Sequence, residues 1–274
     1  MSDGWAIYMA LTLPCRFGIV GQMVSLVGIL NVTPDSFSDG GRFLRPELAI
    51  AHAQAMLEDG ASLIDVGAES TRPHAIPLKA DEEWQRLEST LTVLLHEYPG
   101  MISLDSYHPE TVRRAFRIGP VIVNDITGFM DSAMVEAAAD LRPRVIISHL
   151  PRMGIQEAHE QVPVTTVTQV RNELLEKVAL LESKGVPQAN IIVDPGIGFG
   201  KTMGLNKELL KFAEQIPNYP VMIGYSRKRF LGEDRMKIGP NLSAARIAIR
   251  HGASYLRVHD VAAHAALLRQ EFFI

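Results

Sequence analysis

Residues 28–41 read GILNVTPDSFSDGG, and this stretch decides how the rest of the chain is interpreted. An apolar run over residues 25–30 stops at Asn31, and a polar, glycine-rich segment with two aspartates follows. The pattern predicts a buried strand that ends in a loop. Asn31 would lie at the carboxyl end of that strand, where its amide oxygen can face a hard cation or an anionic substrate.

An ordinary turn, formed by Asn and Asp, would explain this stretch if it stood alone. The same event recurs along the chain, however, because short β-branched runs alternate with segments of helical spacing. Eight strand–helix units in about 250 residues match a (β/α)₈ barrel with a parallel sheet. The eight runs cover residues 25–30, 62–66, 101–105, 121–124, 144–148, 191–193, 221–224 and 255–258.

Two of the intervening segments have clear helical periodicity. Residues 46–59 and 167–184 place apolar side chains at three- and four-residue steps, and Gly60 and Gly185 are their candidate C-caps. The expected faces consist of Leu48, Ala49, Ala53, Met56 and Leu57 in the first helix, and Val167, Val170, Leu174, Val178 and Leu181 in the second.

We therefore predict an α/β fold, a single-domain (β/α)₈ TIM barrel with a short N-terminal extension. Residues 1–23 would form the extension, as a hairpin or a segment that plugs the bottom of the barrel, and residues 24–274 the barrel domain. No linker, low-complexity tract or internal repeat divides the sequence.

The composition is that of an ordinary globular protein, with 47% apolar and 21% charged residues among 274. The net charge of −4 gives no electrostatic reason to expect nucleic acid or an acidic membrane surface as a partner. Cys15 is the only cysteine, which excludes an intrachain disulfide and fits a cytoplasmic setting. The apolar residues 5–30 lack a basic leading segment and contain Pro14 and Arg16, so we expect neither a signal peptide nor a membrane span.

Polar residues stand at the end of every predicted strand. In a barrel of this kind they meet at one rim, the carboxyl face where active sites lie. This placement predicts a polar site independently of any family relationship. The residues are Asn31, Asp65, Asp105, Asn124, Asp125, His149, Asp194, Ser226, Arg227, Lys228, Arg257, His259 and Asp260.

Several of these positions indicate a ligand. Arg72, in the Thr71-Arg72-Pro73 loop, could bind a phosphate through its planar fork, although a lone arginine in a loop is more often solvated. Arg257 and His259 are two residues apart, so they share a strand face. They lie at the end of the eighth strand, and the loops after the seventh and eighth strands of such barrels often bind phosphate.

Asp105 and Asn124 could bind the guanidine-like edge of a heterocycle. Asp65, Glu69 and Asp125 are expected instead to be structural acids.

Residues 194–202, DPGIGFGKT, are not a phosphate loop, because Pro195 stands where that motif needs its first glycine. We interpret them as a glycine-rich rim loop that approaches a flat ligand, with Phe199 as an apolar face. The sequence shows no zinc-binding spacing and no recognisable nucleophile–base signature.

Six separated motifs between residues 27 and 261 resemble the dihydropteroate synthase family. The resemblance implies a pterin-binding barrel that transfers an alkyl group. Such enzymes condense 6-hydroxymethyl-7,8-dihydropterin diphosphate with p-aminobenzoate, releasing pyrophosphate, and use Mg²⁺. It also implies a homodimer, a place in folate biosynthesis and a sulfonamide target.

The resemblance also implies residue roles. Arg72, Lys228, Arg257 and His259 would be catalytic. The residues that would bind the pterin are Asp105, Asn124, Asp194, Phe199 and Lys228. Those that would bind p-aminobenzoate are Phe37, Thr71, Pro73 and Ser226. The diphosphate would be bound by Asn31, Arg72, Arg257 and His259, and Mg²⁺ by Asn31.

One stretch departs from the family pattern. Residues 148–154 read SHLPRMG where the family usually has Met-His-Met-Gln-Gly, so His149 remains and its flanking residues change. Two alternatives therefore accompany the synthase. One is a pterin-binding methyltransferase domain that works with a corrinoid protein. Such a domain would not need the diphosphate-binding set Arg72, Lys228, Arg257 and His259. The other is a paralogue that binds pterin without turnover.

Overall fold

The computed structural model describes residues 17–19, 22–33, 45–69 and 76–272. Eight parallel strands in this part of the chain form a barrel whose order is β7-β6-β5-β4-β3-β2-β9-β8, and a parallel bridge from Val193 to Val221 joins its two ends. The barrel class predicted from the sequence is confirmed. The strands are β2 (Gln22–Asn31), β3 (Leu63–Gly67), β4 (Ile102–Asp105), β5 (Ile122–Asp125), β6 (Val145–Ser148), β7 (Ile191–Asp194), β8 (Met222–Ile223) and β9 (Tyr255–Val258).

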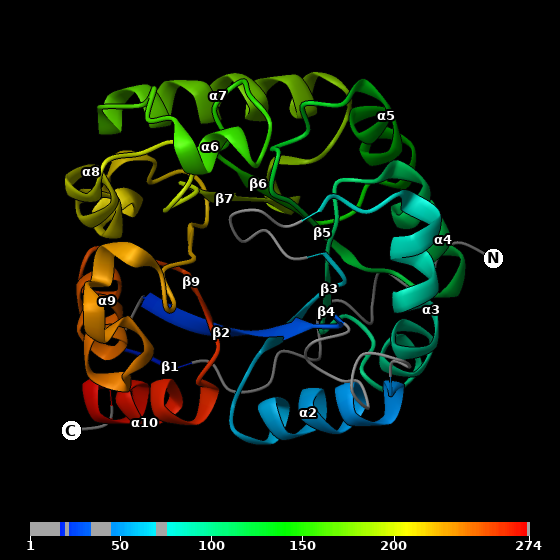
Figure 1. Ribbon diagram of the computed structural model, residues 1–274, viewed down its shortest axis with the longest axis horizontal. Helices are drawn as coiled ribbons and strands as arrows, with labels where there is room; N and C mark the ends of the chain where they lie inside the picture. The colour runs from blue at the N-terminus through cyan, green and yellow to red at the C-terminus, as the bar shows by residue number, and fades with distance from the viewer. Residues whose placement is uncertain (1–16, 20–21, 34–44, 70–75, 273–274) are drawn as a thin grey trace.

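Helices surround the barrel on all sides (Figure 1). The α-helices in the described residues are α2 (Pro46–Glu58), α3 (Ala80–Glu97), α4 (Pro109–Ile118), α5 (Ser132–Leu141), α6 (Glu157–Glu160), α7 (Val167–Ser183), α8 (Met203–Glu208), α9 (Ile238–Arg250) and α10 (Val261–Phe272). Short 3₁₀ segments occupy Gln188–Asn190, Leu209–Gln215, Arg229–Leu231 and Glu233–Met236.

The two helices with clear periodicity form where expected. In α7, Val170, Leu174, Val178 and Leu181 are buried, and Thr166 caps the helix by accepting from the Gln169 amide at 3.2 Å. In α2, Ala49, Ala53 and Met56 are buried, but the prediction for Leu48 was wrong, because 46% of this residue is exposed. Leu48 lies in the first turn of the helix, where the apolar stripe has only begun.

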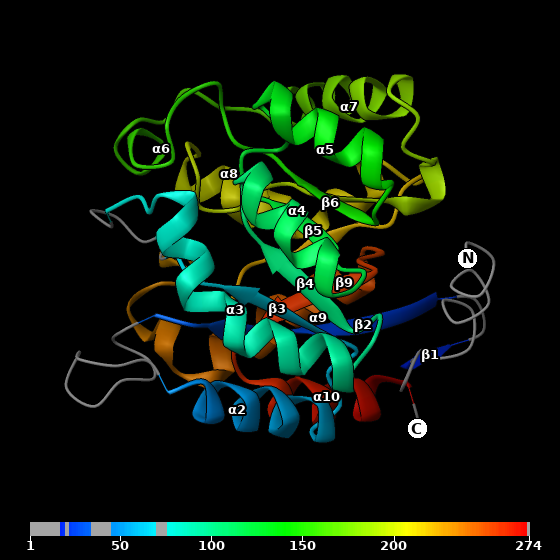
Figure 2. The ribbon, with the colours of Figure 1, turned by 90° about the vertical axis from the view of Figure 1, so that its right-hand side faces the viewer.

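The N-terminal extension is described only in part. Strand β1 (Phe17–Ile19) pairs antiparallel with the start of β2, which matches the hairpin alternative. It lies at the end of the barrel away from α6 (Figure 2). Strand β2 begins at Gln22, next to the predicted division at residue 23. The division itself and a plug at the bottom of the barrel stay predictions.

The barrel interior is built in layers. One ring of buried apolar side chains forms a cluster separate from the larger core that includes the buried faces of the helices. Two residues further along several strands, on the same face, the side chain becomes polar. Leu63 is thus followed by Asp65, Ile122 by Asn124, Ile146 by Ser148, Ile192 by Asp194 and Tyr255 by Arg257. The apolar ring consists of Val27, Leu63, Ile122, Ile146, Ile192 and Met222, with Tyr255 packed against it.

Removing a large side chain from the core should destabilise the barrel. Leu104 in β4 is fully buried, so Leu104→Ala should lower the free energy of unfolding by about 2–5 kcal/mol, through lost contacts and the cavity left behind. Chemical denaturation measures this. Leu180→Ala is the control, because Leu180 is 42% exposed, and it should change stability by no more than about 0.5 kcal/mol. Equal losses in the two variants would contradict the assignment of Leu104 to the core.

Candidate active site

A buried ion-pair chain crosses the mouth of the barrel. Arg257 donates from Nε to Asp65 Oδ2 at 2.6 Å and from Nη2 to Asp105 Oδ2 at 2.7 Å. Arg257 lies on β9, Asp65 on β3 and Asp105 on β4, so the guanidinium reaches past β2, which separates β9 from β3. Asp65 is completely buried, and the Arg257 side chain is 21% exposed. One cation is thus shared by two carboxylates in a poorly hydrated position.

Asn124 is fixed by the same carboxylate. Its Nδ2 donates to Asp65 Oδ2 at 3.0 Å. Asn124 Oδ1 and Asp65 Oδ1 are both buried and have no hydrogen-bond partner within the described part of the chain. Because buried acceptors are normally satisfied, these two oxygens are suited to N–H donors of a bound molecule.

Burial and crowding of charge shift the pKa values here. Burial, followed by the neighbouring charge of Asp65, raises the pKa of Asp105 to about 7, although Arg257 opposes the shift. Burial also raises the pKa of Asp194. Burial lowers the pKa of Lys228 to about 8, against the attraction of Asp194. Burial alone would lower the pKa of Arg257, but Asp65 and Asp105 hold it above its usual value.

The glycine-rich loop brings the second half of the site together. Asp194 Oδ1 accepts from the Gly196 amide at 2.7 Å. The Lys228 ammonium donates to the Ile197 carbonyl and lies 5.0 Å from the centre of the Phe199 ring, which makes a cation–π contact. The loop therefore places the Phe199 ring beside a cation. The sequence predicted Phe199 as an apolar face but not its contact with Lys228.

Ser226 and His259, which follow β8 and β9, form a hydrogen-bonded pair. The Ser226 hydroxyl is 2.9 Å from His259 Nδ1 and accepts from the His259 amide at 3.3 Å. With Nδ1 accepting from the hydroxyl, the neutral imidazole carries its proton on Nε2 and can donate it to an anion. The neighbouring Arg227 does not join this pair; its guanidinium forms an ion pair with Asp260 at 2.9 Å.

The structural acids differ in what they hold. Glu69 accepts from the Leu78 amide at 2.9 Å and from the Tyr107 hydroxyl at 2.7 Å. Asp125 accepts from the amides of Thr127 and Phe129. Both fit the structural role predicted for them. Asp65, which was expected to hold a loop, instead lies inside the barrel and orients Arg257 and Asn124.

Four predicted site residues, Phe37, Thr71, Arg72 and Pro73, lie outside the described residues, and their roles stay predictions. Asn31 is the last residue of β2 and is half-buried, next to Gly67 of β3 in the sheet register.

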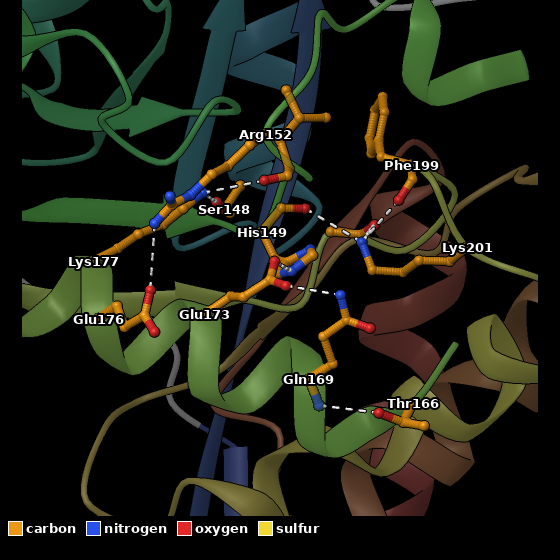
Figure 3. Close-up of polar contacts among 12 residues, drawn as sticks. Ser148, His149, Arg152, Thr166, Gln169, Glu173, Glu176, Lys177, Phe199 and Lys201 are labelled. Atoms are coloured by element: carbon orange, nitrogen blue, oxygen red, sulfur yellow. Dashed lines mark hydrogen bonds and ion pairs between the residues drawn. The ribbon is translucent and has the colours of Figure 1, made fainter. Parts of the chain in front are cut away.

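His149 does not join the site, although the sequence places it at the end of β6. Its Nε2 lies 2.8 Å from Glu173 of α7, outside the barrel (Figure 3). Burial, followed by the charges of Lys201 and Lys177, lowers the pKa of His149 to about 2, so the imidazole is neutral and donates from Nε2. Periodicity explains the outcome, because His149 follows the inward-facing Ser148 and points to the other face.

Sequence reasoning missed two lysines around His149, the buried Lys201 and the half-buried Lys177. Lys201 donates to the carbonyls of His149, Gly196 and Phe199, and Lys177 to those of Thr127, Ser148 and Leu150. Figure 3 shows Lys201 near His149 and Phe199, and Lys177 near Ser148. The available signal was Lys201 itself, which stands in a glycine-rich loop that is not a phosphate loop.

Comparison with known proteins agrees with this geometry. The family model described as pterin binding enzyme matches residues 27–259. A dihydropteroate synthase of Escherichia coli K12 is 36% identical over 246 residues, covering 86% of each chain, and one of Streptococcus pyogenes serotype M18 is 37% identical over 259 residues, covering 91% of this chain and 94% of the relative. The chain belongs to the dihydropteroate synthase family.

Solved dihydropteroate synthases share the fold. The Yersinia pestis enzyme, solved with a sulfonamide drug complex, has a TM-score of 0.82 and 29% identity, and the alignment covers 93% of this chain and 97% of that one. The Xanthomonas albilineans enzyme in complex with 7,8-dihydropteroate has a TM-score of 0.78 and 32% identity, with 94% and 97% covered.

The stretch that departs from the family pattern is buried over residues 148–151 and becomes exposed at Arg152. Leu150 is buried in a small cluster with Ala158 and Phe199, which makes it an apolar neighbour of the glycine-rich loop. Lys177 holds the backbone on either side of His149. Arg152 is exposed, with Glu176 3.6 Å away. The altered residues thus keep an apolar contact with Phe199.

If Asp105 and Lys228 hold a neutral pterin, as the family resemblance implies, the affinity should depend on pH through these two groups. Asp105 must be ionised to accept N–H donors, so affinity should fall about tenfold per unit as pH drops below about 7. Lys228 must be protonated to donate, so affinity should also fall above about pH 8. Titration of 6-hydroxymethylpterin across this range measures both limbs. Asp105→Asn should flatten the acid limb, and an unchanged acid limb in that variant would assign the proton to another group.

Proposed function

We propose that the chain condenses 6-hydroxymethyl-7,8-dihydropterin diphosphate with p-aminobenzoate to give 7,8-dihydropteroate and pyrophosphate in folate biosynthesis. The observation that carries this proposal is the barrel mouth, where buried acids and an amide adjoin Arg257, Lys228 and His259. Acids and an amide suit the polar edge of a pterin, and the cations suit a diphosphate. Family membership and the ligands named for the Xanthomonas albilineans enzyme support the same reaction.

The pterin would lie against the glycine-rich loop. Asp105, Asn124 and Asp194 offer oxygen acceptors to its N–H groups, and Lys228 offers a donor to its carbonyl or ring nitrogen. Phe199 supplies an apolar face beside Lys228. Because Asn124 Nδ2 is already bonded to Asp65, the amide would present Oδ1.

The diphosphate would bind the cations next to the pterin. Arg257 uses two of its five N–H groups for Asp65 and Asp105, which leaves three for phosphate oxygens. His259 adds an N–H from Nε2, and Arg72 is proposed to add a second guanidinium. These groups would stabilise the negative charge that develops as the diphosphate leaves.

The residues present fit a magnesium ion bound mainly through the substrate. Among the described residues no cluster of three or more His, Cys, Asp or Glu could hold a metal on its own. Mg²⁺ commonly keeps several waters and takes one or two protein ligands together with substrate phosphates. The amide oxygen of Asn31, at the end of β2, suits that partial role. When bound, the ion would neutralise charge on the diphosphate.

The reaction then needs little base catalysis. We propose a dissociative displacement, in which the bond between the pterin methylene carbon and the diphosphate oxygen breaks and the pair of electrons leaves with pyrophosphate. The neutral aromatic amine attacks the methylene carbon and loses one proton, to the released pyrophosphate or to solvent. Arg257 and His259 would stabilise the leaving group, and closure of the mouth around the substrates would exclude water from the cationic carbon.

Other parts of the proposal rest on the family relationship. p-Aminobenzoate would enter beside Phe37, Thr71, Pro73 and Ser226, where a sulfonamide would compete with it. We also propose a homodimer and a cytoplasmic location. In the described part of the chain no helix is long and apolar enough to cross a membrane.

Pyrophosphate release by the purified protein tests the proposed function. The protein receives the pterin diphosphate with and without p-aminobenzoate, in the presence and absence of Mg²⁺. We expect release coupled to dihydropteroate formation, dependent on p-aminobenzoate and strongly reduced without Mg²⁺. Tight pterin binding without product would instead identify the non-catalytic paralogue, and methyl transfer to a corrinoid protein would identify the methyltransferase.

Substitution of Arg257 should separate its two roles. Arg257→Lys keeps a positive charge near Asp65 and Asp105 but loses the planar fork, so kcat/KM should fall about a hundredfold while the fold persists. Arg257→Ala leaves the completely buried Asp65 without its cation and should also cost about 3–5 kcal/mol of stability. Steady-state kinetics and chemical denaturation measure the two effects. Turnover of Arg257→Lys at the unsubstituted rate would remove Arg257 from the catalytic role.

A further inference from the structure

Lys201 is the buried centre of a carbonyl cage. Only 6% of the residue is exposed, and its ammonium donates to Gly196 O at 2.8 Å, Phe199 O at 2.9 Å and His149 O at 3.3 Å (Figure 3). Three acceptors match the three N–H groups of an ammonium. Two of these carbonyls belong to the glycine-rich loop and the third to the segment after β6, so Lys201 joins the two.

The glycine-rich loop packs closely against the segment after β6 and is hydrogen-bonded to α8. Gly196 has a φ of +63°, and a Cβ there would lie 1.9 Å from the His149 carbonyl oxygen. Asn206 of α8 also holds the loop, because it accepts from the Gly198 amide at 2.8 Å and donates to the Lys201 carbonyl at 3.3 Å. The loop conformation therefore depends on polar contacts to two buried side chains, Lys201 and Asn206.

Lys228 contacts the same loop. The Ile197 carbonyl accepts from the Lys228 ammonium, and the Phe199 ring centre lies 5.0 Å from it. A Cβ on Gly198 would lie 3.3 Å from Lys228 Cδ. The loop thus sets the position of the Lys228 side chain, while Lys201 contacts the backbone at residues 196 and 199, on either side of this seat.

We propose that Lys201 is a positioning residue for pterin recognition, which clamps the glycine-rich loop so that Ile197 and Phe199 hold Lys228 at the pterin edge. This inference rests on the proposed pterin role of Lys228. Lys201 itself touches no substrate in this arrangement, because its N–H groups are used by the backbone. Its removal should weaken pterin binding through Lys228.

Lys177 provides a matched control. It donates to Thr127 O at 3.0 Å, Ser148 O at 3.3 Å and Leu150 O at 3.4 Å, so it is a second lysine in a carbonyl cage. None of its three acceptors belongs to the glycine-rich loop. Lys177 is half-buried where Lys201 is buried, but replacing either lysine with methionine removes a cation that three carbonyls accept from. Only the Lys201 replacement removes contacts to the loop that holds Lys228.

The experiment is a double-mutant cycle on pterin affinity. Lys201→Met, Lys228→Gln and the double variant are titrated with 6-hydroxymethylpterin, and thermal unfolding is recorded for each and for Lys177→Met. Lys201→Met should weaken binding about tenfold or more, since small displacements of a binding group are costly. In the Lys228→Gln background the same replacement should weaken binding by less than about twofold, because coupled residues are non-additive. Lys177→Met should lower the unfolding temperature comparably and leave pterin affinity within about threefold.

Three results would overturn the proposal: unchanged affinity in Lys201→Met, an equal loss of affinity in Lys177→Met, or full additivity in the double variant. Unchanged affinity in Lys228→Gln would instead overturn the proposed pterin role of Lys228, and this inference with it. If Lys201→Met does not fold, Lys201→Gln takes its place in the cycle, because its amide keeps two N–H donors for the loop carbonyls.

Discussion

The shared cation at Arg257 is the interaction on which the barrel mouth depends. Asp65 is completely buried, and a carboxylate in that position is stable only beside a cation that is itself fixed. Arg257 meets this need and also carries Asp105, which therefore competes for the same charge. The raised pKa of Asp105 follows from this competition, since burial and the charge of Asp65 outweigh the attraction of Arg257. The barrel mouth thus contains more acid than Arg257 can neutralise.

This arrangement is a direct product of barrel geometry. Parallel strands that advance by two residues on one face carry the chain from an apolar ring to a polar ring, as from Leu63 to Asp65 and from Tyr255 to Arg257. The apolar ring fills the interior below and excludes water from the floor of the polar one. The apolar ring that stabilises the barrel and the polar ring that can bind a ligand are therefore about two residues apart along the strands. Exclusion of water stabilises the apolar ring and also shifts the pKa values of the polar side chains above it.

The sequence predicted this architecture well because its signals are local. All eight strand runs were identified, and α7 begins at the predicted Val167, since β-branched runs and helical steps report burial directly. Asp105, Asn124 and Asp194 could be assigned to the mouth because they end or lie next to the end of a strand. The pairing of Asp65 with Arg257 could not be predicted, because it joins residues 192 positions apart and depends on side-chain reach across β2. Lys201 was missed for a related reason, since a lysine after a glycine-rich run gives no sign of which carbonyls will surround it.

The carbonyl groups bound by Lys177 and Lys201 explain how the fold accommodates the residues after β6 that differ from the family pattern. Residues 148–154 lack the family's usual side chains, yet the backbone there is held by carbonyl contacts to Lys177 and Lys201, which do not depend on the identity of those side chains. Backbone carbonyls are the same in every sequence, so a segment fixed through them can change its side chains without losing its path. What must be retained is an apolar neighbour for the loop, and Leu150 packs with Phe199 in that place. The altered segment therefore keeps its contact with the glycine-rich loop, while the position of Lys228 is set by that loop, which Lys201 holds.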